Sequence, residues 1–275
     1  MRTLYITDLD GTFFDNSGTV SDESRRIIND LTKQGLLFSV ATARSQLTVK
    51  TLLQGLDFPA PIILMNGVFL YDLAKERTVS YHEISPRAFL KVVAAFQAYN
   101  KAPMLFLYGD DGRLSVQYTR LDLQINRDFY QARKKVLGDR FYKADCLHIP
   151  KGQHAVYVNL VDTFESLKPI TEILKTVEGV RFSFYGDTYT DYWFLEVYSA
   201  DASKANGATE LKTRLRADRV IAFGDNYNDL PLFAVADEKY AVANAVAEVK
   251  AQATAVIDSN EKNGVAKFLL QQFQG

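Results

Sequence analysis

Acidic side chains follow short apolar runs at two distant places in this sequence. Asp8 and Asp10 come directly after the first run, and Asp225 and Asp229 come after a later one, Val220 to Phe223. Carboxylates gathered at one place repel each other and resist ionisation unless a cation joins them. Carboxylate and carbonyl oxygens, without a cluster of His or Cys, favour Mg²⁺. The pattern therefore predicts a magnesium site, provided that the fold brings the two runs together.

The runs that precede these acids are predicted strands of a parallel sheet. Apolar stretches of strand length alternate with amphipathic helices, and we expect Asp22 to cap the first helix and Gly35 to end it. This alternation is typical of parallel strands joined by crossover helices. The predicted strands are residues 4–7, 36–41, 61–65, 220–223, 240–243 and 254–257.

Further polar residues stand where predicted strands end, which is where ligands bind in an open parallel sheet. Thr42 and Arg44 follow the second strand, Asn66 follows the third, and Asn228 comes after Asp225. Simpler interpretations stay open for each. Thr42 and Asn228 could be helix caps, and Asn66 could be only a turn residue. Arg44 suits a structural or rim cation better than a catalytic one.

The middle of the chain has a different pattern. Residues 104–108 and 114–118 are predicted strands on either side of a Gly-Asp-Asp-Gly-Arg hairpin connection. Further aromatic-rich strands and helices follow, which indicates an α+β unit. We therefore predict an α/β fold with a Rossmann-like parallel-sheet core interrupted by an inserted α+β cap domain. The expected boundaries are 1–82 and 199–275 for the core and 83–198 for the cap.

Four segments in order resemble the motifs of the haloacid dehalogenase-like superfamily. Asp8-Leu9-Asp10-Gly11-Thr12 resembles the first motif, Thr42 the second, Lys204 the third and Gly224 to Asp229 the fourth. The resemblance covers essentially the whole chain. Features typical of the Cof-type sugar-phosphatase branch are Asn66-Gly67, the large insertion, Asn244-Ala245 and Asn263-Gly264-Val265-Ala266.

The resemblance implies a Mg²⁺-dependent phosphatase that hydrolyses a small phosphorylated metabolite, such as a sugar phosphate. Asp8 would be the nucleophile that forms an aspartyl-phosphate, and Asp10 would carry protons. Lys204 would be catalytic, and the substrate-binding candidates are Thr42, Asn66 and Asn228. The implied metal ligands are Asp8, Asp225 and the backbone carbonyl of Asp10, supported by Asp229.

Two departures from the family pattern stand beside these motifs. Ala205 follows Lys204 where the family usually has glycine, which leaves the pose of Lys204 open. We still expect the ammonium group within about 6 Å of Asp8, close enough to perturb its charge. Pro231 stands in the segment after the fourth motif, where it suits the first turn of a helix.

Composition limits the partners and the location. A net charge of −1 gives no reason to expect nucleic acid or a membrane surface. The single cysteine, Cys146, cannot form an internal disulfide, which fits the cytoplasm, and we expect it to be packed as a small hydrophobe. No secretory signal or membrane span is evident. A monomer or a homodimer is compatible with the sequence.

Alternatives from other classes are a phosphosugar mutase and a low-turnover regulator that binds phosphorylated metabolites. A dehalogenase fits less well, because it needs no acid–base group at Asp10. Substrate choice would depend on the cap, where the aromatic residues at 182–194 favour a packed core. The polar stretch at 187–191 is the better candidate for contact with the substrate.

Overall fold

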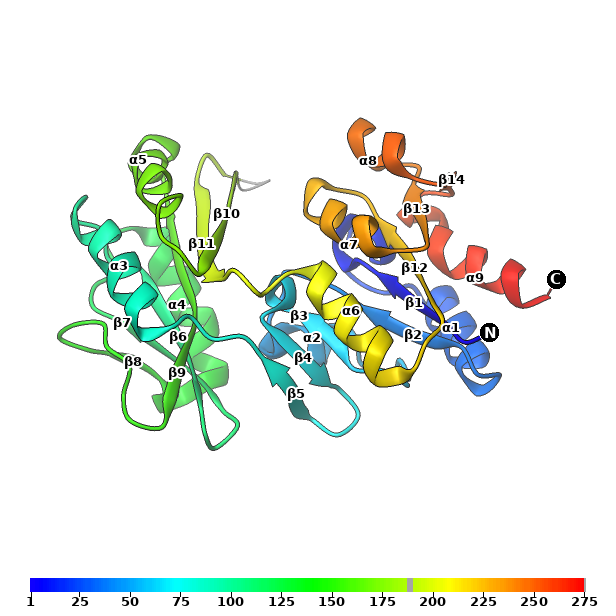
Figure 1. Ribbon diagram of the computed structural model, residues 1–275, viewed down its shortest axis with the longest axis horizontal. Coiled ribbons are helices and arrows are strands. Elements are labelled where there is room, and N and C mark those ends of the chain that lie inside the picture. The colour runs from blue at the N-terminus through cyan, green and yellow to red at the C-terminus, as the bar shows by residue number, and fades with distance from the viewer. Residues whose placement is uncertain (187–189, 275) are drawn as a thin grey trace. The chain divides into compact units, whose positions relative to one another are not determined.

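Figure 1 shows a computed structural model of the chain, which describes residues 1–186 and 190–274. The chain divides into two compact units. Unit 1 comprises Met1–Tyr81 and Ala202–Gly275, and unit 2 comprises His82–Asp201. In the described ranges, no helix is long and apolar enough to cross a membrane.

Unit 1 is built on a parallel sheet with the strand order β14-β13-β12-β1-β2. In β1 and β12, Thr7 lies beside Phe223, so the residues after these neighbouring strands emerge at one edge. The parallel-sheet core is therefore confirmed. Its strands are β1 (Thr3–Thr7), β2 (Leu37–Val40), β12 (Arg219–Gly224), β13 (Glu238–Val242) and β14 (Ala255–Ile257).

A smaller antiparallel sheet adjoins β2 in unit 1. Its strands are β3 (Ile62–Leu64), β4 (Phe69–Asp72) and β5 (Arg77–Tyr81). A parallel bridge from Ala41 to Ile63 links β3 to the end of β2, so the third predicted strand also reaches the edge at which β1 and β12 end. The hairpin of β4 and β5 was not predicted, because both strands are short and much of their surface is only half-buried.

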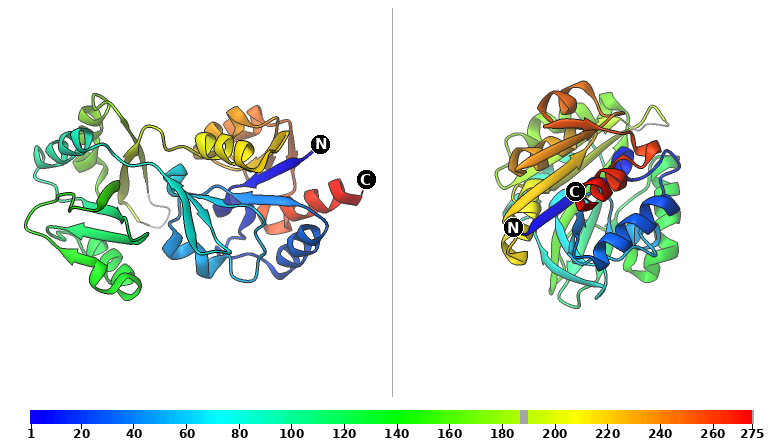
Figure 2. Two further views of the ribbon diagram at one scale, coloured as in Figure 1. Left: turned by 60° about the horizontal axis from the view of Figure 1, so that its bottom comes forward. Right: turned by 90° about the vertical axis from the view of Figure 1, so that its right-hand side faces the viewer.

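Helices cover both faces of the parallel sheet. Helix α1 packs with α9 and α6 packs with α7, and Figures 1 and 2 show the two pairs on opposite faces. The unit 1 helices are α1 (Asp22–Lys33), α2 (Gln46–Leu52), α6 (Lys204–Leu215), α7 (Leu230–Val235), α8 (Ala247–Gln252) and α9 (Gly264–Gln274). Pro231 lies in the first turn of α7, as expected.

The cap of α1 differs from the prediction. The side chain of Ser21, not Asp22, accepts the hydrogen bond from the backbone N–H of Ser24. Asp22 is the first helical residue, where a negative charge is still favourable beside the helix dipole. Both residue types are good caps, so the sequence alone did not choose between neighbours.

Unit 2 contains a mixed sheet with the order β10-β11-β9-β6-β7-β8. Its pairs are antiparallel except β7 with β8, a short parallel strand that the sequence did not predict. The strands are β6 (Met104–Gly109), β7 (Leu114–Tyr118), β8 (Phe141–Lys143), β9 (Gln153–Asp162), β10 (Val180–Gly186) and β11 (Trp193–Ser199). The helices are α3 (Pro86–Gln97), α4 (Gln124–Leu137) and α5 (Phe164–Leu174).

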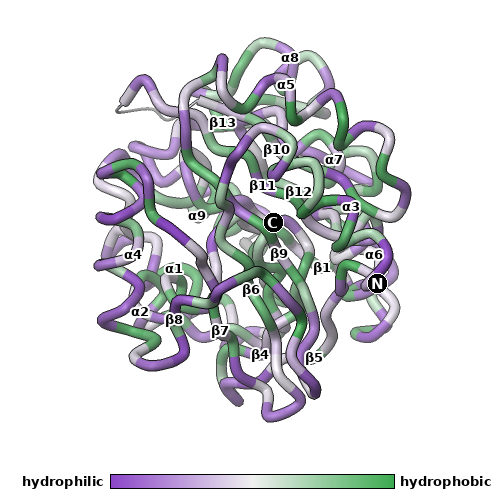
Figure 3. Tube along the Cα trace, turned by 90° about the vertical axis from the view of Figure 1, so that its left-hand side faces the viewer, coloured by the Kyte–Doolittle hydropathy of each residue, from purple (hydrophilic) through white to green (hydrophobic). Residues whose placement is uncertain are grey.

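The apolar core of unit 2 lies between one sheet face and helices α3 and α5. Leu105 and Leu107 of β6, Val158 of β9 and Leu195 of β11 belong to this core and are fully buried. Figure 3 shows the apolar character of β6 and β9 as green tube. Burying each such side chain contributes about 1.5–3 kcal/mol, so this face accounts for much of the stability of the unit.

The aromatic cluster predicted in this unit is partly core and partly surface. Phe184 and Trp193 pack against each other with ring centroids 4.6 Å apart, whereas Tyr185 is exposed and stacks on Phe194. Residues 187–189 of the stretch predicted to contact the substrate lie outside the described residues. The expectation for Cys146 was wrong, because this residue is exposed.

A histidine of unit 2 provides a test of its pH-dependent stability. His154 Nε2 lies 3.1 Å from a carboxylate oxygen of Asp110, and its Nδ1 pairs with Glu83. The hydrogen bond to Asp110, assisted by Glu83, raises the pKa of His154 above its ordinary value of 6.5 despite partial burial. A raised folded-state pKa gives stability that is fully present below about pH 6.5 and is lost as the pH rises through the folded-state value.

We expect His154→Gln to flatten this part of the pH profile by less than about 1 kcal/mol, because the partners are exposed. Urea unfolding between pH 5.5 and 8.5, followed by the fluorescence of the single tryptophan, Trp193, measures the effect in unit 2. His148→Gln, a change at an exposed histidine of the same unit, is the matched control. An unchanged profile in His154→Gln would contradict the role of this ion pair.

Candidate active site

The centre of the site is a buried lysine between two carboxylates. Lys204 Nζ lies 2.6 Å from Asp8 Oδ1 and 2.7 Å from Asp229 Oδ1. The side chains of all three are buried, with exposed fractions of 1% for Lys204, 6% for Asp8 and 0% for Asp229. The ammonium group thus lies beside Asp8 as expected, and Ala205 does not prevent this pose.

Asp229 also organises the loop that follows β12. Its second oxygen accepts hydrogen bonds from the backbone N–H groups of Asp225, at 2.9 Å, and Asn226, at 3.2 Å. Asn226 caps the short helical turn at Tyr227–Asp229, so the cap residue of this loop is Asn226 and not Asn228. Asn228 is exposed on the same turn, and its predicted contact with the substrate stays a prediction.

Asp225 is held by residues of the first motif. Thr12 Oγ1 donates to Asp225 Oδ1 at 2.7 Å. Gly11 has a φ of +76°, and a Cβ at this position would lie 2.4 Å from Asp225 Oδ2. Only glycine therefore allows the turn after Asp10 to pass so close to the carboxylate. Thr12, for which the sequence suggested no role, is the partner that orients Asp225.

Burial and neighbouring charges shift the pKa values of the groups in the site. Burial, opposed by Lys204, holds the pKa of Asp8 well above its usual range. Burial likewise raises the pKa of Asp225 to about 6. Burial alone would lower the pKa of Lys204, but the carboxylates of Asp229 and Asp8 outweigh it and raise the pKa. The lysine therefore stays charged, while the raised pKa values of Asp8 and Asp225 show that one ammonium group does not compensate for the burial of both acids.

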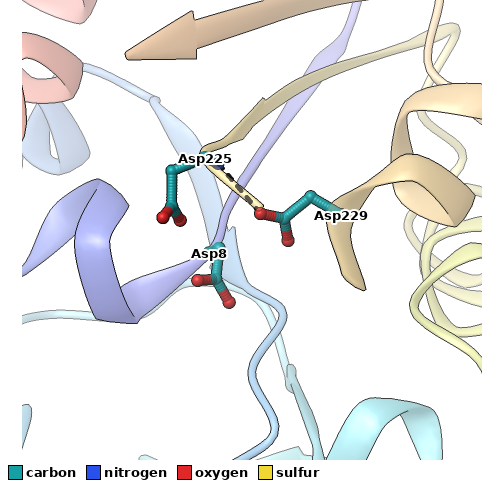
Figure 4. Close-up of side chains that lie close together, drawn as sticks. All are labelled: Asp8, Asp225 and Asp229. Atoms are coloured by element: carbon teal, nitrogen blue, oxygen red, sulfur yellow. Dashed lines mark hydrogen bonds between the residues drawn. The ribbon is translucent and has the colours of Figure 1, made fainter. Parts of the chain in front are cut away.

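The three acids form a group that fits a divalent cation. Asp8, Asp225 and Asp229 each offer an oxygen, and these oxygens lie within 4.8 Å of one another. Figure 4 shows the three side chains together, with the hydrogen bond from Asp225 N–H to Asp229. Both Asp229 oxygens already have donors, whereas Asp8 and Asp225 each keep one oxygen without a donor among the described residues. The donor set suits Mg²⁺ best at Asp8 and Asp225.

Asp10 does not join this buried group. Its carboxylate accepts two hydrogen bonds from Arg44, from Nε at 2.7 Å and from Nη2 at 2.6 Å. The side chain of Asp10 is 51% exposed. Asp8 and Asp10 were expected to act on the same phosphoryl group, but the structure separates a buried acid from one that is paired at the surface. A contribution of the Asp10 backbone carbonyl to a metal site remains a prediction.

A backbone hydrogen bond joins Thr42 and Asn66. The Thr42 hydroxyl accepts the backbone N–H of Arg44 at 3.1 Å, and the Asn66 N–H donates to the Thr42 carbonyl at 3.0 Å. Asn66 has a φ of +55°, and its buried Oδ1 has no hydrogen-bond partner in the described part of the chain. Asn66 is therefore a turn residue in a left-handed conformation, and its side chain retains an unsatisfied acceptor.

The same turn positions the lysine. A Cβ on Gly67 would lie 2.3 Å from the backbone carbonyl oxygen of Ser203, so the turn packs directly against the start of α6. Ser203 caps this helix by accepting the N–H of Asn206, and Lys204 is its first residue. The ends of β2 and β3 thereby hold the helix terminus from which Lys204 reaches Asp8.

Comparisons with known proteins identify the family of the chain. Residues 5–269 match the family model described as haloacid dehalogenase-like hydrolase, and the chain belongs to this family. It is 28% identical to the 5-amino-6-(5-phospho-D-ribitylamino)uracil phosphatase YwtE of Bacillus subtilis, covering 100% of this chain and 99% of that protein. It is 23% identical to the pyridoxal phosphate phosphatase YbhA of Escherichia coli, covering 98% of each.

Solved structures share the fold. A phosphatase of the same superfamily from Bacteroides thetaiotaomicron gives a TM-score of 0.76 at 20% identity, with 100% of this chain and 96% of that chain covered. A protein from Thermotoga maritima gives 0.73 at 21% identity, with 98% and 97% covered. The family and the fold class expected from the sequence motifs are thus confirmed.

Proposed function

We propose that this protein is a Mg²⁺-dependent phosphatase that hydrolyses a small phosphorylated metabolite through an aspartyl-phosphate on Asp8. The observation that carries the proposal is the contact of the buried Asp8 carboxylate with Lys204, beside Asp225. A nucleophile for phosphoryl transfer needs dense positive charge around the transferred group. The hydrolase family to which the chain belongs supports this chemistry.

The proposed reaction has two steps. A carboxylate oxygen of Asp8 attacks phosphorus, the bond from phosphorus to the ester oxygen breaks, and Asp10, in its protonated form, gives its proton to that oxygen and becomes a carboxylate. Water then attacks phosphorus of the aspartyl-phosphate and passes a proton to the Asp10 carboxylate. The bond from phosphorus to the Asp8 oxygen breaks, which releases phosphate and regenerates the Asp8 carboxylate and protonated Asp10. Lys204 balances the charge that spreads over the phosphoryl oxygens, and the Thr42 hydroxyl is proposed to bind one of these oxygens.

Asp8 and Asp225 would hold Mg²⁺, with the Asp10 backbone carbonyl as a third ligand and Asp229 in support. When bound, the cation neutralises negative charge on the phosphoryl group and orients it. Thr12 keeps one oxygen of Asp225 occupied through its 2.7 Å hydrogen bond, so the second oxygen is presented to the cation. Asp229 keeps Lys204 in place and the loop closed through its own three hydrogen bonds.

The substrate class follows from the family and its relatives. Proteins similar to this chain are named as phosphatases of a ribitylaminouracil phosphate, of pyridoxal phosphate and of phosphoglycolate, which are all small phosphate esters. We assign the choice among such esters to unit 2, the predicted cap, because the acidic and lysine groups of the site all belong to unit 1. A cytoplasmic location completes the proposal.

Removal of divalent cations is expected to abolish hydrolysis, and Mg²⁺ is expected to restore it. Among the residues that the structure describes, the acids of the site have one buried ammonium group to balance them, so the cation should also stabilise the folded chain. Binding at one hundred times the dissociation constant adds about 2.7 kcal/mol. Phosphate release from p-nitrophenyl phosphate, together with thermal unfolding with EDTA and then with added Mg²⁺, measures both effects.

The variant Asp225→Asn tests the same site, because it removes the charge of one proposed ligand and nearly keeps the shape of the side chain. This variant should lose most of the stabilisation by Mg²⁺ and most of the activity. Full activity after exhaustive chelation would show that hydrolysis does not require the proposed Mg²⁺ ion. Isomerised product without free phosphate, on a phosphosugar, would instead show a mutase, and binding without turnover would show a regulator.

A further inference from the structure

The ion pair of Arg44 with Asp10 is bidentate. Two different guanidinium nitrogens donate to the two oxygens of one carboxylate, at 2.7 and 2.6 Å. Arginine alone offers such a planar fork, which fixes the orientation of its partner as well as its charge. The side chains of Arg44 and Asp10 are 33% and 51% exposed, so burial does not force the two charges to pair.

The backbone on both sides of the Arg44 Cα is held in place. Its N–H donates to the Thr42 hydroxyl at 3.1 Å, and its carbonyl accepts the N–H of Met65 at 3.0 Å. The guanidinium carbon lies 5.7 Å from the ring centroid of Phe14, within the range of a cation–π contact. We call these contacts the frame of Arg44. They hold both its backbone and one face of its guanidinium group, and so they fix the position of the fork.

The frame includes a strained turn. Met65 and Asn66 both have left-handed backbones, with φ of +49° and +55°. For residues other than glycine such conformations are uncommon, cost of order 1–3 kcal/mol where sparsely populated, and cluster at functional sites. In this turn, the two strained residues direct their N–H groups to the carbonyls of Arg44 and Thr42. The strained turn thus holds the backbone of the segment from Thr42 to Arg44, which carries the guanidinium fork.

We propose that Arg44 is a positioning residue that acts through Asp10 and fixes the orientation from which Asp10 exchanges protons. The inference rests on the proposed phosphatase function and adds a residue to it. A half-exposed aspartate without the fork would populate several rotamers. Proton transfer needs a heavy-atom distance of about 2.6–3.2 Å, so a misplaced carboxyl group transfers poorly. Arg44 itself does not touch the substrate in this proposal.

The test compares two substrates through kcat/KM, which reports formation of the aspartyl-phosphate. The leaving group of glycerol phosphate needs a proton, whereas that of p-nitrophenyl phosphate does not. Arg44→Gln is expected to lower kcat/KM about 10–100-fold on glycerol phosphate and less than about threefold on p-nitrophenyl phosphate. Arg44→Lys, which keeps the charge but loses the fork, should recover only part of the loss.

A double variant isolates the path of the effect. Arg44→Gln combined with Asp10→Asn should be no slower on glycerol phosphate than Asp10→Asn alone, because the fork then has nothing to position. Arg214→Gln is the matched control, since it removes an exposed 2.7 Å pair with Glu210 on α6 of the same unit. Thermal unfolding of each variant shows whether the chain is folded.

Three results would overturn the role of Arg44 without affecting the proposed phosphatase function. Equal losses on both substrates with a raised KM would show a direct phosphate contact, additive losses in the double variant would show independent action, and unchanged kinetics would show a plain surface pair. Failure of the wild-type chain with Mg²⁺ to hydrolyse either substrate would instead overturn the proposed function and, with it, any role of Arg44 in that reaction.

Discussion

Asp8→Asn is expected to reduce turnover below detection while the chain stays folded. Asparagine has nearly the same shape, but its amide is not a nucleophile toward phosphorus. Lys204 keeps its 2.7 Å contact with Asp229 in this variant, so the buried ammonium group is not left alone. The free energy of unfolding should change by no more than about 1–2 kcal/mol. Radiolabelled phosphate from the substrate should not attach to the variant protein.

Asp10→Asn should behave differently in the same experiment, because Asp10 moves protons in both steps without forming a bond to phosphorus. General acid–base groups contribute about 10²–10⁴-fold. With p-nitrophenyl phosphate the first step needs no acid, so this variant should release about one equivalent of nitrophenol in a burst and then slow. Labelled phosphate should accumulate on the protein during the burst. Near wild-type rates in either variant would show that its assigned role is wrong.

The positions of the main acids were predictable from the sequence, because they depend on backbone topology. Asp8 and Asp225 follow apolar strands, and parallel neighbours such as β1 and β12 bring the residues after them to one edge. Lys204 was predictable only through the order of the motifs. Its contact with Asp8 is made across 196 residues, and only the fold brings them together.

Side-chain direction was the part that the sequence did not determine. Asp10 is two residues from Asp8, yet it leaves the buried group because Arg44, 34 residues away, holds it by both oxygens. Thr12 orients Asp225 across 213 residues. Such pairings depend on rotamers and on the turn at Gly11, so a pattern of residue types cannot rank them.

Neighbouring residues of equivalent type caused the remaining errors. Ser21 and Asp22 are both good helix caps, as are Asn226 and Asn228, and a shift of one or two residues decides which one caps. The β4–β5 hairpin was missed because short, half-buried strands lack a distinctive pattern of alternation. These errors concern helix caps and a hairpin, not the acids of the site, and they did not change the chemistry predicted for it.

Lys204→Met is expected to damage both activity and stability, and the two losses can be separated. The buried ammonium group contacts Asp8 at 2.6 Å and Asp229 at 2.7 Å, and methionine fills a similar volume without charge. Loss of a preorganised donor to the transferring phosphoryl group costs about 10²–10³-fold in kcat/KM. Two buried carboxylates without their cation should destabilise unit 1 by about 3–5 kcal/mol.

A second substitution tests whether one cause explains both losses. Adding Asp229→Asn to Lys204→Met removes one of the uncompensated charges, so much of the stability should return. The activity should not return, because no cation would then face the phosphoryl group opposite Mg²⁺. Lys212→Met is the matched control: its 3.1 Å pair with Asp237 is exposed, and its loss should shift the free energy of unfolding by less than about 0.5 kcal/mol. Recovery of activity along with stability would show that Lys204 only holds the fold together, and unchanged turnover in Lys204→Met would remove it from the reaction.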